Sequence, residues 1–198
     1  MKRIFDIVLA LFGLLFFSPI FIISSLLIFC EDFNSPFYIS KRVGKDFKSF
    51  HFIKLRSMLI NADKSGINST SDNDIRITKI GKFIRKFKLD ELPQLWNVLI
   101  GDMSFVGPRP NVESEVKLYT MKEKKLLRVK PGITDFASII FSDEGSILKN
   151  HKNPDLGYHQ LIRPGKNALA LFYLKRNNIL IDFYIILLTV LAIFNKKK

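Results

Sequence analysis

Cysteine is almost absent from this 198-residue sequence, which contains only Cys30. A single cysteine cannot form an intrachain disulfide, so other interactions hold the fold together, as is usual in a reducing compartment. The three histidines, His51, His151 and His159, do not have the spacing of zinc ligands. A glycine-rich phosphate loop and a dinucleotide-binding fingerprint are also missing, which excludes the nucleotide-binding folds that depend on them.

Acidic residues are scarce as well, with 18 aspartates and glutamates against 31 lysines and arginines, a net charge of +13. So strong a positive charge favours a polyanion or an anionic membrane surface as partner. The sequence is 47% apolar with 19 phenylalanines, which is too apolar for a disordered chain and favours the membrane. A single-stranded nucleic-acid binder would interleave aromatic residues with cations, whereas these phenylalanines mostly fall on apolar faces. We therefore expect membrane lipids, and no nucleic acid, among the partners.

A long uncharged run occupies residues 7–30, and its 24 residues are enough to cross a bilayer, which takes about 20. The run is too long for a signal peptide and has no small-residue cleavage site before Glu31. Ser18-Pro19 in its middle disfavours a straight helix, and basic residues flank both ends, which favours keeping both ends in the cytoplasm. These features predict a re-entrant helix–break–helix over residues 1–33; a proline-kinked spanning helix is the alternative.

The C-terminal segment has only about a dozen uncharged residues after Asp182, fewer than a membrane span needs. This predicts a helix that lies in the membrane interface, with Lys196–Lys198 near acidic headgroups. A buried core helix with a frayed tail is the alternative.

Between the two ends, the pattern predicts a domain over residues 34–198 that mixes short strands with helices. Apolar and polar residues alternate over residues 37–58 around Gly44, which predicts short strands or a hairpin near the membrane surface. Residues 62–73 are rich in Ser, Asn, Asp and Gly and predict a mobile loop. Residues 74–88 repeat apolar side chains at helical spacing among many cations, as in a basic amphipathic helix. We therefore expect a mainly helical α+β fold.

One stretch, LDELPQLWNVLIGDMSFVGPRP at residues 89–110, places an acidic pair where a helix should begin. Pro93 suits the first turn of a helix and Gly101 its C-terminal end. Asp90 and Glu91 would then lie at the helix N-terminus, where acidic residues are ordinary capping groups. The same position suits a phosphate, because free N–H groups and the helix dipole attract anions.

Arginines close to the acidic pair favour the second interpretation. Arg109 is held between Pro108 and Pro110, which restrict its backbone, and Arg85 precedes Asp90 by five residues. Carboxylates beside phosphate-binding arginines make electrostatic sense when a divalent metal is present, and Mg²⁺ takes one or two carboxylates plus phosphate oxygens. The pattern therefore predicts phosphoryl chemistry at a membrane surface.

Three motifs together resemble the bacterial sugar transferase family, the small monotopic phosphoglycosyl transferases that begin glycan assembly on polyprenyl phosphate. They are KLRSM at residues 54–58, the stretch at 89–110 and KPGIT at 130–134. The resemblance continues through the N-terminal run and through a pattern of tail residues, namely Pro154, Tyr158, Pro164, Lys166, Tyr173 and Asp182.

This resemblance implies an enzyme that transfers a sugar 1-phosphate from a UDP-sugar to undecaprenyl phosphate and releases UMP. It implies a re-entrant helix broken at Ser18-Pro19 and a catalytic domain on the cytoplasmic side of the bacterial inner membrane. The product, a polyprenyl diphosphosugar, would begin O-antigen, capsule, exopolysaccharide or glycoprotein assembly. A homodimer is left open, and a catalytically inactive membrane scaffold is a rival hypothesis.

The resemblance also implies roles for the acidic pair. Asp90 would be the nucleophile that forms a covalent phosphosugar intermediate, an established type of carboxylate catalysis. Glu91 together with Asp90 would hold Mg²⁺, which offsets charge on the diphosphate and on the leaving UMP.

The neighbouring residues complete the expected site. Arginine's planar fork suits phosphate oxygens, so we expect phosphate contacts from Arg109 and Arg85. Lys54 is a further phosphate-binding candidate, with a structural or lipid-headgroup role as its alternative. Pro108 and Pro110 would shape the pocket rather than react.

Departures from the family pattern follow KPGIT, where Asp135-Phe136 replaces the commoner Gly-Trp. Residues 137–148 carry an acidic stretch instead, and we expect this region to bear on sugar choice or local packing. Asp143 and Glu144 are candidates for substrate contact there, with a helix-start cap as the alternative.

Overall fold

The structure is a computed structural model, and it describes residues 1–62, 70–71, 74–149, 151 and 153–194. This part of the chain is a mainly helical α+β fold, as the sequence predicts. The loop predicted over residues 62–73 falls almost entirely outside the described residues, and so does the predicted lysine tail at Lys196–Lys198.

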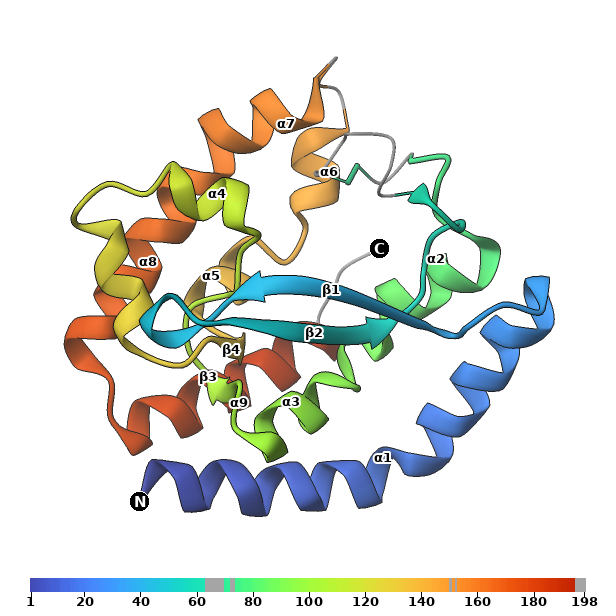
Figure 1. The fold of residues 1–198 in the computed structure, drawn as a ribbon, viewed down its shortest axis with the longest axis horizontal. Helices are drawn as coiled ribbons and strands as arrows, with labels where there is room; N and C mark the ends of the chain where they lie inside the picture. The colour runs from blue at the N-terminus through green and yellow to red at the C-terminus, as the bar shows by residue number, and fades with distance from the viewer. Residues whose placement is uncertain (63–69, 72–73, 150, 152, 195–198) are drawn as a thin grey trace.

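Helix α1, Lys2–Asp32, runs without interruption through Ser18 and Pro19. The prediction of two helices separated by a break is therefore wrong, and Figure 1 shows one helix that bends partway along its length. Pro19 has no N–H for the helical hydrogen bond. The Ser18 hydroxyl donates to the carbonyl of Leu15 at 2.8 Å, and such contacts often bend helices.

The N-terminal half of α1 is fastened to the rest of the chain by polar contacts. The carboxylate of Asp6, a buried residue, accepts from the Ser104 hydroxyl at 3.0 Å and from the Phe105 N–H at 3.1 Å. The guanidinium of Arg3 donates to two carbonyls near the end of α3, Gln94–Ile100, at 2.6 and 2.8 Å. A cation at this end of a helix also interacts favourably with its dipole.

The C-terminal end of α1 is fastened as well, because Asp32 forms a two-pronged ion pair with Arg56 at 2.6 Å for both contacts. Only 17% of the most apolar 18-residue stretch of α1 is buried, and the helix is long and apolar enough to cross a membrane. Its exposed apolar side chains include Leu11, Phe12, Leu15, Phe16, Ile22, Ile23 and Leu26. A large exposed apolar surface of this kind marks a contact with a membrane or a partner.

Strands β1, Phe37–Val43, and β2, Ser49–Leu55, form the predicted antiparallel hairpin, which turns through Gly44 and the 3₁₀ segment η1, Lys45–Phe47. Directly opposed residues lie on one face of such a pair. The inner face of the hairpin is thus made of Tyr38 with Lys54, Ser40 with Phe52, and Arg42 with Phe50. Its two phenylalanines are buried in one cluster with Ala10, Val98 and Met103.

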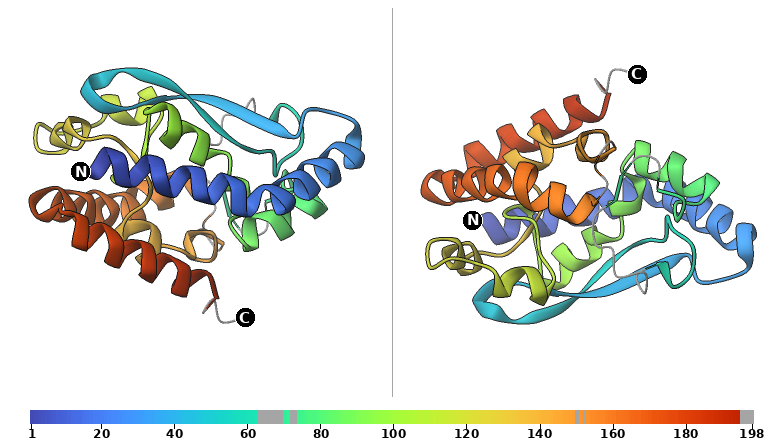
Figure 2. Two further views of the ribbon diagram at one scale, coloured as in Figure 1. Left: turned by 90° about the horizontal axis from the view of Figure 1, so that it is seen from below. Right: turned by 90° about the horizontal axis from the view of Figure 1, so that it is seen from above.

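Figure 2 shows α1 crossing the underside of the molecule, with the hairpin on one side and the C-terminal helices on the other. Helix α2, Lys79–Lys86, is shorter than predicted. Thr78 is extended and its hydroxyl accepts from a backbone N–H three residues on at 2.9 Å, so the N-cap starts the helix here. The residues before it turn instead, and Ile77 forms an isolated bridge with Met58.

A short parallel sheet joins two of the sequence motifs. Strand β3, Ser104–Val106, pairs with β4, Gly132–Thr134, so the GPRP sequence follows one strand while KPGIT contains the other. Backbone hydrogen bonds of 3.0 and 3.1 Å extend this pairing to Gly107 and Pro108. The backbones approach so closely that a Cβ on Gly132 would lie 2.1 Å from the Gly107 nitrogen, so only glycine fits.

The rest of the chain is helical and packs around this sheet (Figure 1). The segments are α4 Glu113–Lys117, the 3₁₀ segment η4 Glu123–Arg128, α5 Phe136–Ile140, α6 Glu144–Leu148, α7 Pro154–Gly157, the π-helical segment η5 Tyr158–Ile162, α8 Arg163–Arg176 and α9 Ile179–Phe194.

Helix α9 combines the two alternatives that the sequence left open. Its Asp182 carboxylate is buried, accepts from the Tyr173 hydroxyl at 2.6 Å and pairs with Lys2, which ties α9 to α8 and α1. Leu180 and Phe183 on the same helix are 78% and 62% exposed. One face of α9 therefore belongs to the core, and another presents apolar side chains outward.

Candidate active site

The acidic pair lies in a 3₁₀ turn, η3, Leu89–Glu91, rather than in the first turn of α3. Lys88, with a left-handed φ of 57°, turns the chain between α2 and this segment. Pro93 and Gly101 bound α3 as predicted, and Gly101 has a φ of 101°. The carboxylate of Asp90 makes no capping bond, so the ordinary capping interpretation does not describe this residue.

Asp90 is buried, and its Oδ1 atom accepts no hydrogen bond from any described residue. Burial raises the pKa of Asp90, and the neighbouring Glu91 carboxylate raises it further. The cations that act in the opposite direction on this pKa are Lys54, Lys88 and Arg85. A carboxylate oxygen that is held among cations but committed to no partner is available to a ligand.

Glu91 has the opposite surroundings, because its Oε1 accepts from Arg109 Nη2 at 2.8 Å. Burial alone would raise the pKa of Glu91, but Arg109 and Lys88 outweigh it and bring the pKa to about 2. The same pairing raises the pKa of Arg109. Two adjacent carboxylates whose pKa values are pushed apart are suited to different roles.

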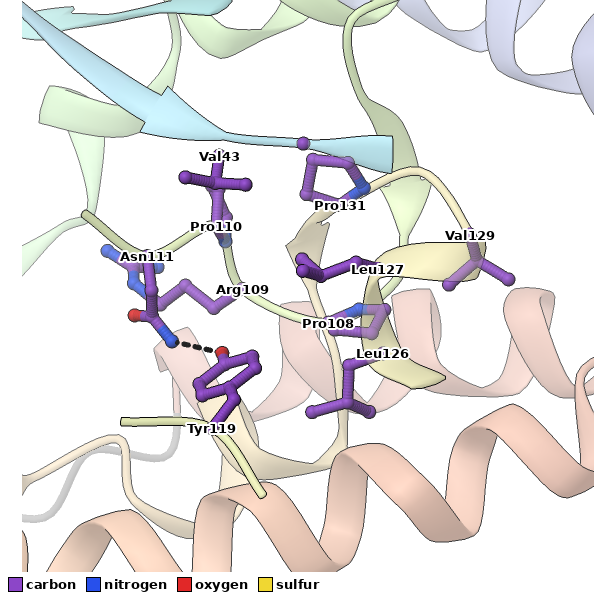
Figure 3. A pocket seen from close by; sticks show the side chains of 11 residues that line it. Val43, Pro108, Arg109, Pro110, Asn111, Tyr119, Leu126, Leu127, Val129 and Pro131 are labelled. Atoms are coloured by element: carbon purple, nitrogen blue, oxygen red, sulfur yellow. Dashed lines mark hydrogen bonds between the residues drawn. The ribbon is translucent and has the colours of Figure 1, made fainter. Parts of the chain in front are cut away.

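The Pro108-Arg109-Pro110 segment is held from both sides. The Pro108 carbonyl accepts from the Gly132 N–H at 3.0 Å, and the Asn111 carbonyl accepts from the Val43 N–H at 2.9 Å. Figure 3 shows the small pocket that this segment lines, with the Asn111 amide donating to the hydroxyl of a tyrosine at 2.7 Å. Its volume of about 10 Å³ is no more than one water needs, so it is packed framework rather than a ligand pocket.

Lys54 projects from the inner face of β2 into this cluster. Burial lowers its pKa to about 8, and Asp90 partly offsets the effect by attraction. Arg85 acts on the pKa of Asp90 from α2. The fold therefore brings together five of the predicted side chains, Asp90, Glu91, Arg109, Lys54 and Arg85, whereas Ser18 and Pro19 lie in α1 and only bend it.

Arg42 was not predicted as a site residue, yet it belongs to the same cluster. It shares the inner face of the hairpin with Lys54. Burial lowers the pKa of Arg42, and the charge of Arg109 lowers it further. Its guanidinium carbon lies 5.6 Å from the ring centre of Phe52, a cation–π distance. The sequence did contain a signal for Arg42. Side chains alternate between the two faces along a strand, so Arg42 lies on the same face of β1 as Tyr38, the residue opposite Lys54.

Of the two candidate residues in the acidic stretch after α5, Glu144 acts on the site and Asp143 does not. Glu144 pairs with Lys166, and its charge helps to raise the pKa of Arg109. Asp143 instead accepts from the Ser146 hydroxyl at 2.6 Å, a local contact at the start of α6. Lys166 also lies 5.4 Å from the ring centre of Tyr158. The sequence gives no signal for this pairing, because the partners are 22 residues apart on different helices.

The donor set is compatible with Mg²⁺. Within the described part of the chain, no group of three or more His, Cys, Asp or Glu side chains is placed to hold a metal ion by itself. Mg²⁺ does not require such a group, since it binds through one or two carboxylates and substrate phosphates. Asp90 with its unpartnered oxygen and the adjacent Glu91 supply two carboxylates of this kind.

Comparison with known proteins identifies the class of protein. The family model described as "Bacterial sugar transferase" matches residues 1–196. The chain therefore belongs to the bacterial sugar transferase family, and the resemblance drawn from its motifs is confirmed.

The relatives include two proteins named as undecaprenyl-phosphate transferases and one named as an exopolysaccharide production protein. The UDP-N-acetylgalactosamine-undecaprenyl-phosphate N-acetylgalactosaminephosphotransferase of Aeromonas hydrophila is 37% identical over 70% of this chain and 34% of its own length. The exopolysaccharide production protein ExoY of Rhizobium meliloti is 40% identical over 67% and 66%. The UDP-glucose:undecaprenyl-phosphate glucose-1-phosphate transferase of Klebsiella pneumoniae is 39% identical over 70% and 30%. The aligned part thus spans between about a third and two thirds of these relatives' lengths.

Proposed function

We propose that this protein transfers a sugar 1-phosphate from a UDP-sugar to undecaprenyl phosphate and releases UMP, with a covalent phosphosugar on Asp90 between the two steps. Family membership and the names of the relatives support the overall reaction. The observation that carries the mechanism is the contrast within the acidic pair. Asp90 is buried with an unpartnered oxygen, whereas Glu91 is committed to Arg109.

In the first step, an Asp90 carboxylate oxygen attacks the phosphorus that bears the sugar. The new oxygen–phosphorus bond forms as the bond from this phosphorus to the oxygen between the two phosphates breaks. UMP leaves with the electron pair of the broken bond. In the second step, an oxygen of undecaprenyl phosphate attacks the same phosphorus and Asp90 leaves as a carboxylate. The product is the polyprenyl diphosphosugar.

The cations of the cluster make these steps electrostatically possible. A carboxylate and a diphosphate repel each other, so positive charge must surround the point where they meet. Lys54 and Arg85 act on Asp90, while Arg109 is fixed by Glu91 and by the two prolines. Arginine binds phosphate oxygens in a planar, two-pronged manner. Arg42, beside Arg109, adds a further cation for the diphosphate.

Asp90 and Glu91 would hold Mg²⁺ in this site. When bound, the ion would stabilise negative charge on the diphosphate and on the leaving UMP. The Arg109–Glu91 pair keeps Glu91 ionised, because it brings the pKa of Glu91 to about 2, so this carboxylate would be available to the metal at neutral pH.

We further propose that residues 1–33 form the re-entrant membrane element and residues 34–198 the catalytic domain, on the cytoplasmic side of the inner membrane. Both ends of α1 are held by the same body of protein, through Asp6 and through Asp32. A bent helix fixed in this way places its apolar middle in one leaflet while the site stays at the headgroup level. There, the phosphate of a lipid-bound acceptor meets a water-soluble UDP-sugar.

The decisive experiment compares Asp90→Asn with Asp102→Asn, a control in the same motif whose charge acts on Lys130 and is not among the charges that shift the pKa of Asp90 or Glu91. Purified full-length protein in lipid nanodiscs receives Mg²⁺, undecaprenyl phosphate and each of several UDP-sugars, and UMP is measured. We expect Asp90→Asn to abolish UMP release while membrane association is unchanged, and the control to stay near the wild type. Mass spectrometry of quenched wild-type protein should locate a phosphosugar on Asp90. Near-normal UMP release by Asp90→Asn would show that another residue is the nucleophile.

A further inference from the structure

Gln94, the first residue of α3, is only 1% exposed and lies four residues after Asp90, which is buried in the preceding 3₁₀ turn. Gln94 precedes Asn97 by three residues, a spacing that places these two side chains on one face of α3. The Asn97 side chain bonds to two backbone groups of β2, at 2.7 and 3.2 Å. This face of α3 is therefore directed at β2, the strand that carries Lys54.

The amide nitrogen of Gln94 is buried and donates no hydrogen bond to any residue that the structure describes. A buried donor without an acceptor destabilises a folded protein, and nearly all such groups are partnered. Among the described residues, the other buried side-chain atom in this state is Oδ1 of Asp90, four residues earlier in the chain. An unpartnered buried donor lies four residues from an unpartnered buried acceptor, and the acceptor lies among the cations of the site. This pair points to a ligand that uses both.

Asn97 shows what a structural amide looks like on this face. It is fully buried like Gln94, but both ends of its side-chain amide are bonded, and they join α3 to the hairpin. The Gln94 amide makes no such connection. A role in holding the fold together therefore fits Asn97 and not Gln94.

We propose that the Gln94 amide donates a hydrogen bond to a phosphoryl oxygen of the sugar phosphate while that phosphorus is bonded to Asp90. This assignment rests on the proposed function. When the Asp90 oxygen–phosphorus bond forms and UMP departs with its electron pair, the phosphorus keeps non-bridging oxygens that carry negative charge. The neutral N–H of Gln94 partners one of them, exchanges no proton, and leaves net charge compensation to Lys54 and Arg85.

A neutral donor has a specific advantage beside this nucleophile. A further cation would lower the pKa of Asp90 and weaken its carboxylate as a nucleophile, whereas an amide N–H perturbs the free carboxylate less. Hydrogen bonds aimed at charge that develops during a reaction accelerate it, because they are in place before the reaction begins. Gln94 thus stabilises the phosphorylated state of Asp90 more than the free state.

The test replaces Gln94 with methionine, which has nearly the same shape and no N–H. Full-length protein in nanodiscs is assayed with undecaprenyl phosphate, Mg²⁺ and whichever of UDP-galactose, UDP-glucose and UDP-N-acetylgalactosamine gives the fastest wild-type UMP release. We expect Gln94→Met to lower turnover about 10- to 100-fold, the range for losing a hydrogen bond to a charged group. Its thermal midpoint should stay equal or rise, because a buried unpartnered polar group has been removed.

The chain supplies a matched control in Gln160, an exposed glutamine on η5, so Gln160→Met should leave both readouts unchanged. Gln94→Glu, which has the same length but offers a negative acceptor, should lose more activity than Gln94→Met. The amount of phosphosugar adduct on Asp90, measured without undecaprenyl phosphate, should fall in the same order.

The outcomes distinguish a failure of the proposed function from a failure of the role assigned to Gln94. If the wild type releases no UMP from any of the three donors and forms no adduct, the proposed function fails and this assignment fails with it. If the wild type is active and Gln94→Met stays within about twofold of it, the proposed function stands and the role of Gln94 is refuted. A loss of activity accompanied by a clearly lower thermal midpoint would instead assign Gln94 to the fold.

Discussion

Asp90 and Glu91 are neighbours in the chain, yet the fold gives them opposite electrostatic surroundings. Burial and the adjacent carboxylate raise the pKa of Asp90, while Arg109 holds the pKa of Glu91 at about 2. At neutral pH, Glu91 is therefore a fixed anion, whereas the Asp90 carboxylate is more basic and unpartnered. The more basic oxygen is the better nucleophile, and the fixed anion is the better metal ligand, which separates the two roles.

We expect Lys54 to make the activity pH-dependent. Burial lowers its pKa to about 8, so its positive charge is lost as the pH rises through this value. Because the charged ammonium attracts the diphosphate, we expect kcat/KM for the UDP-sugar to fall with a midpoint near 8. Lys54→Arg keeps its charge at all these pH values, so its fall should begin at higher pH. UMP release measured from about pH 6.5 to about pH 9.5 checks both profiles.

Lys117→Arg, on an exposed lysine of α4, is the matched control and should reproduce the wild-type profile. A wild-type profile that stays flat through pH 9, or an identical fall in Lys54→Arg, would remove Lys54 from the phosphate site. In that case its alternative, a structural or headgroup role, would be favoured.

Site residues could be predicted from the sequence where they lie close together in the chain, and were harder to predict where distant segments bring them together. Asp90, Glu91 and Arg109 lie within one 22-residue motif, so their proximity could be read from the sequence. Arg42 depends on the hairpin register, and Glu144 depends on the packing of α6 against α8. Alternation along β1 indicates the face on which Arg42 lies but not the register, and the Glu144 contact has no local pattern. The sequence also could not show that Asp90 lacks a capping bond, because this depends on the 3₁₀ geometry of η3.

Elements were predictable where turn residues and periodicity are strong. The hairpin follows from alternation around Gly44, and the end of α3 follows from Gly101. The start of α2 was misplaced because Ile77 pairs with Met58, a contact between distant residues that overrides the helical pattern. In α1, Pro19 removes a single hydrogen bond, which bends a long apolar helix without ending it.

The β3–β4 pair is the element on which the Arg109 segment depends. A Cβ on Gly132 would meet the nitrogen, oxygen and Cα of Gly107 at 2.1 to 2.7 Å, and backbone cannot move aside as a side chain can. We expect Gly132→Ala to cost about 3 kcal/mol of stability and to lower the thermal midpoint by about 6–12 °C. UMP release should fall as well, because Pro108 loses its hydrogen bond to the strand.

Gly13→Ala is the control for this substitution, since its Cβ would approach only the flexible side chain of Leu95, at 3.1 Å. Alanine is also the better helix former, so we expect little change in the thermal midpoint. Thermal unfolding of both variants in the same detergent decides the question. Equal thermal midpoints for the two variants would show that the β3–β4 pair accommodates a Cβ at position 132 without loss of stability.

At the scale of the whole molecule, the polar anchors of α1 determine how it can sit in a membrane. A straight helix of 31 residues would be about 46 Å long, more than the ~30 Å of hydrocarbon, and would place its two ends on opposite sides. Here the first turns bond to Ser104 and to α3, while the last turn bonds to Arg56. Since all these partners belong to one body of protein, separating the two ends would break either the Asp32–Arg56 ion pair or the hydrogen bonds of the buried Asp6 carboxylate. Leaving a buried carboxylate without its donors is destabilising.

We therefore expect both ends of α1 to face the cytoplasm. Thiol labelling can be directed to one chosen position, because Cys30 is the one cysteine in the sequence and can be replaced by serine. In that background, an N-terminal epitope tag reports on the start of α1, and Lys48→Cys, in the turn between β1 and β2, reports on the domain that follows it. A membrane-impermeant maleimide and a protease should reach both positions in inverted vesicles and neither position from outside intact cells. Opposite accessibility of the two positions would mean that α1 crosses the bilayer, and the anchors at Asp6 and Asp32 could not both be formed.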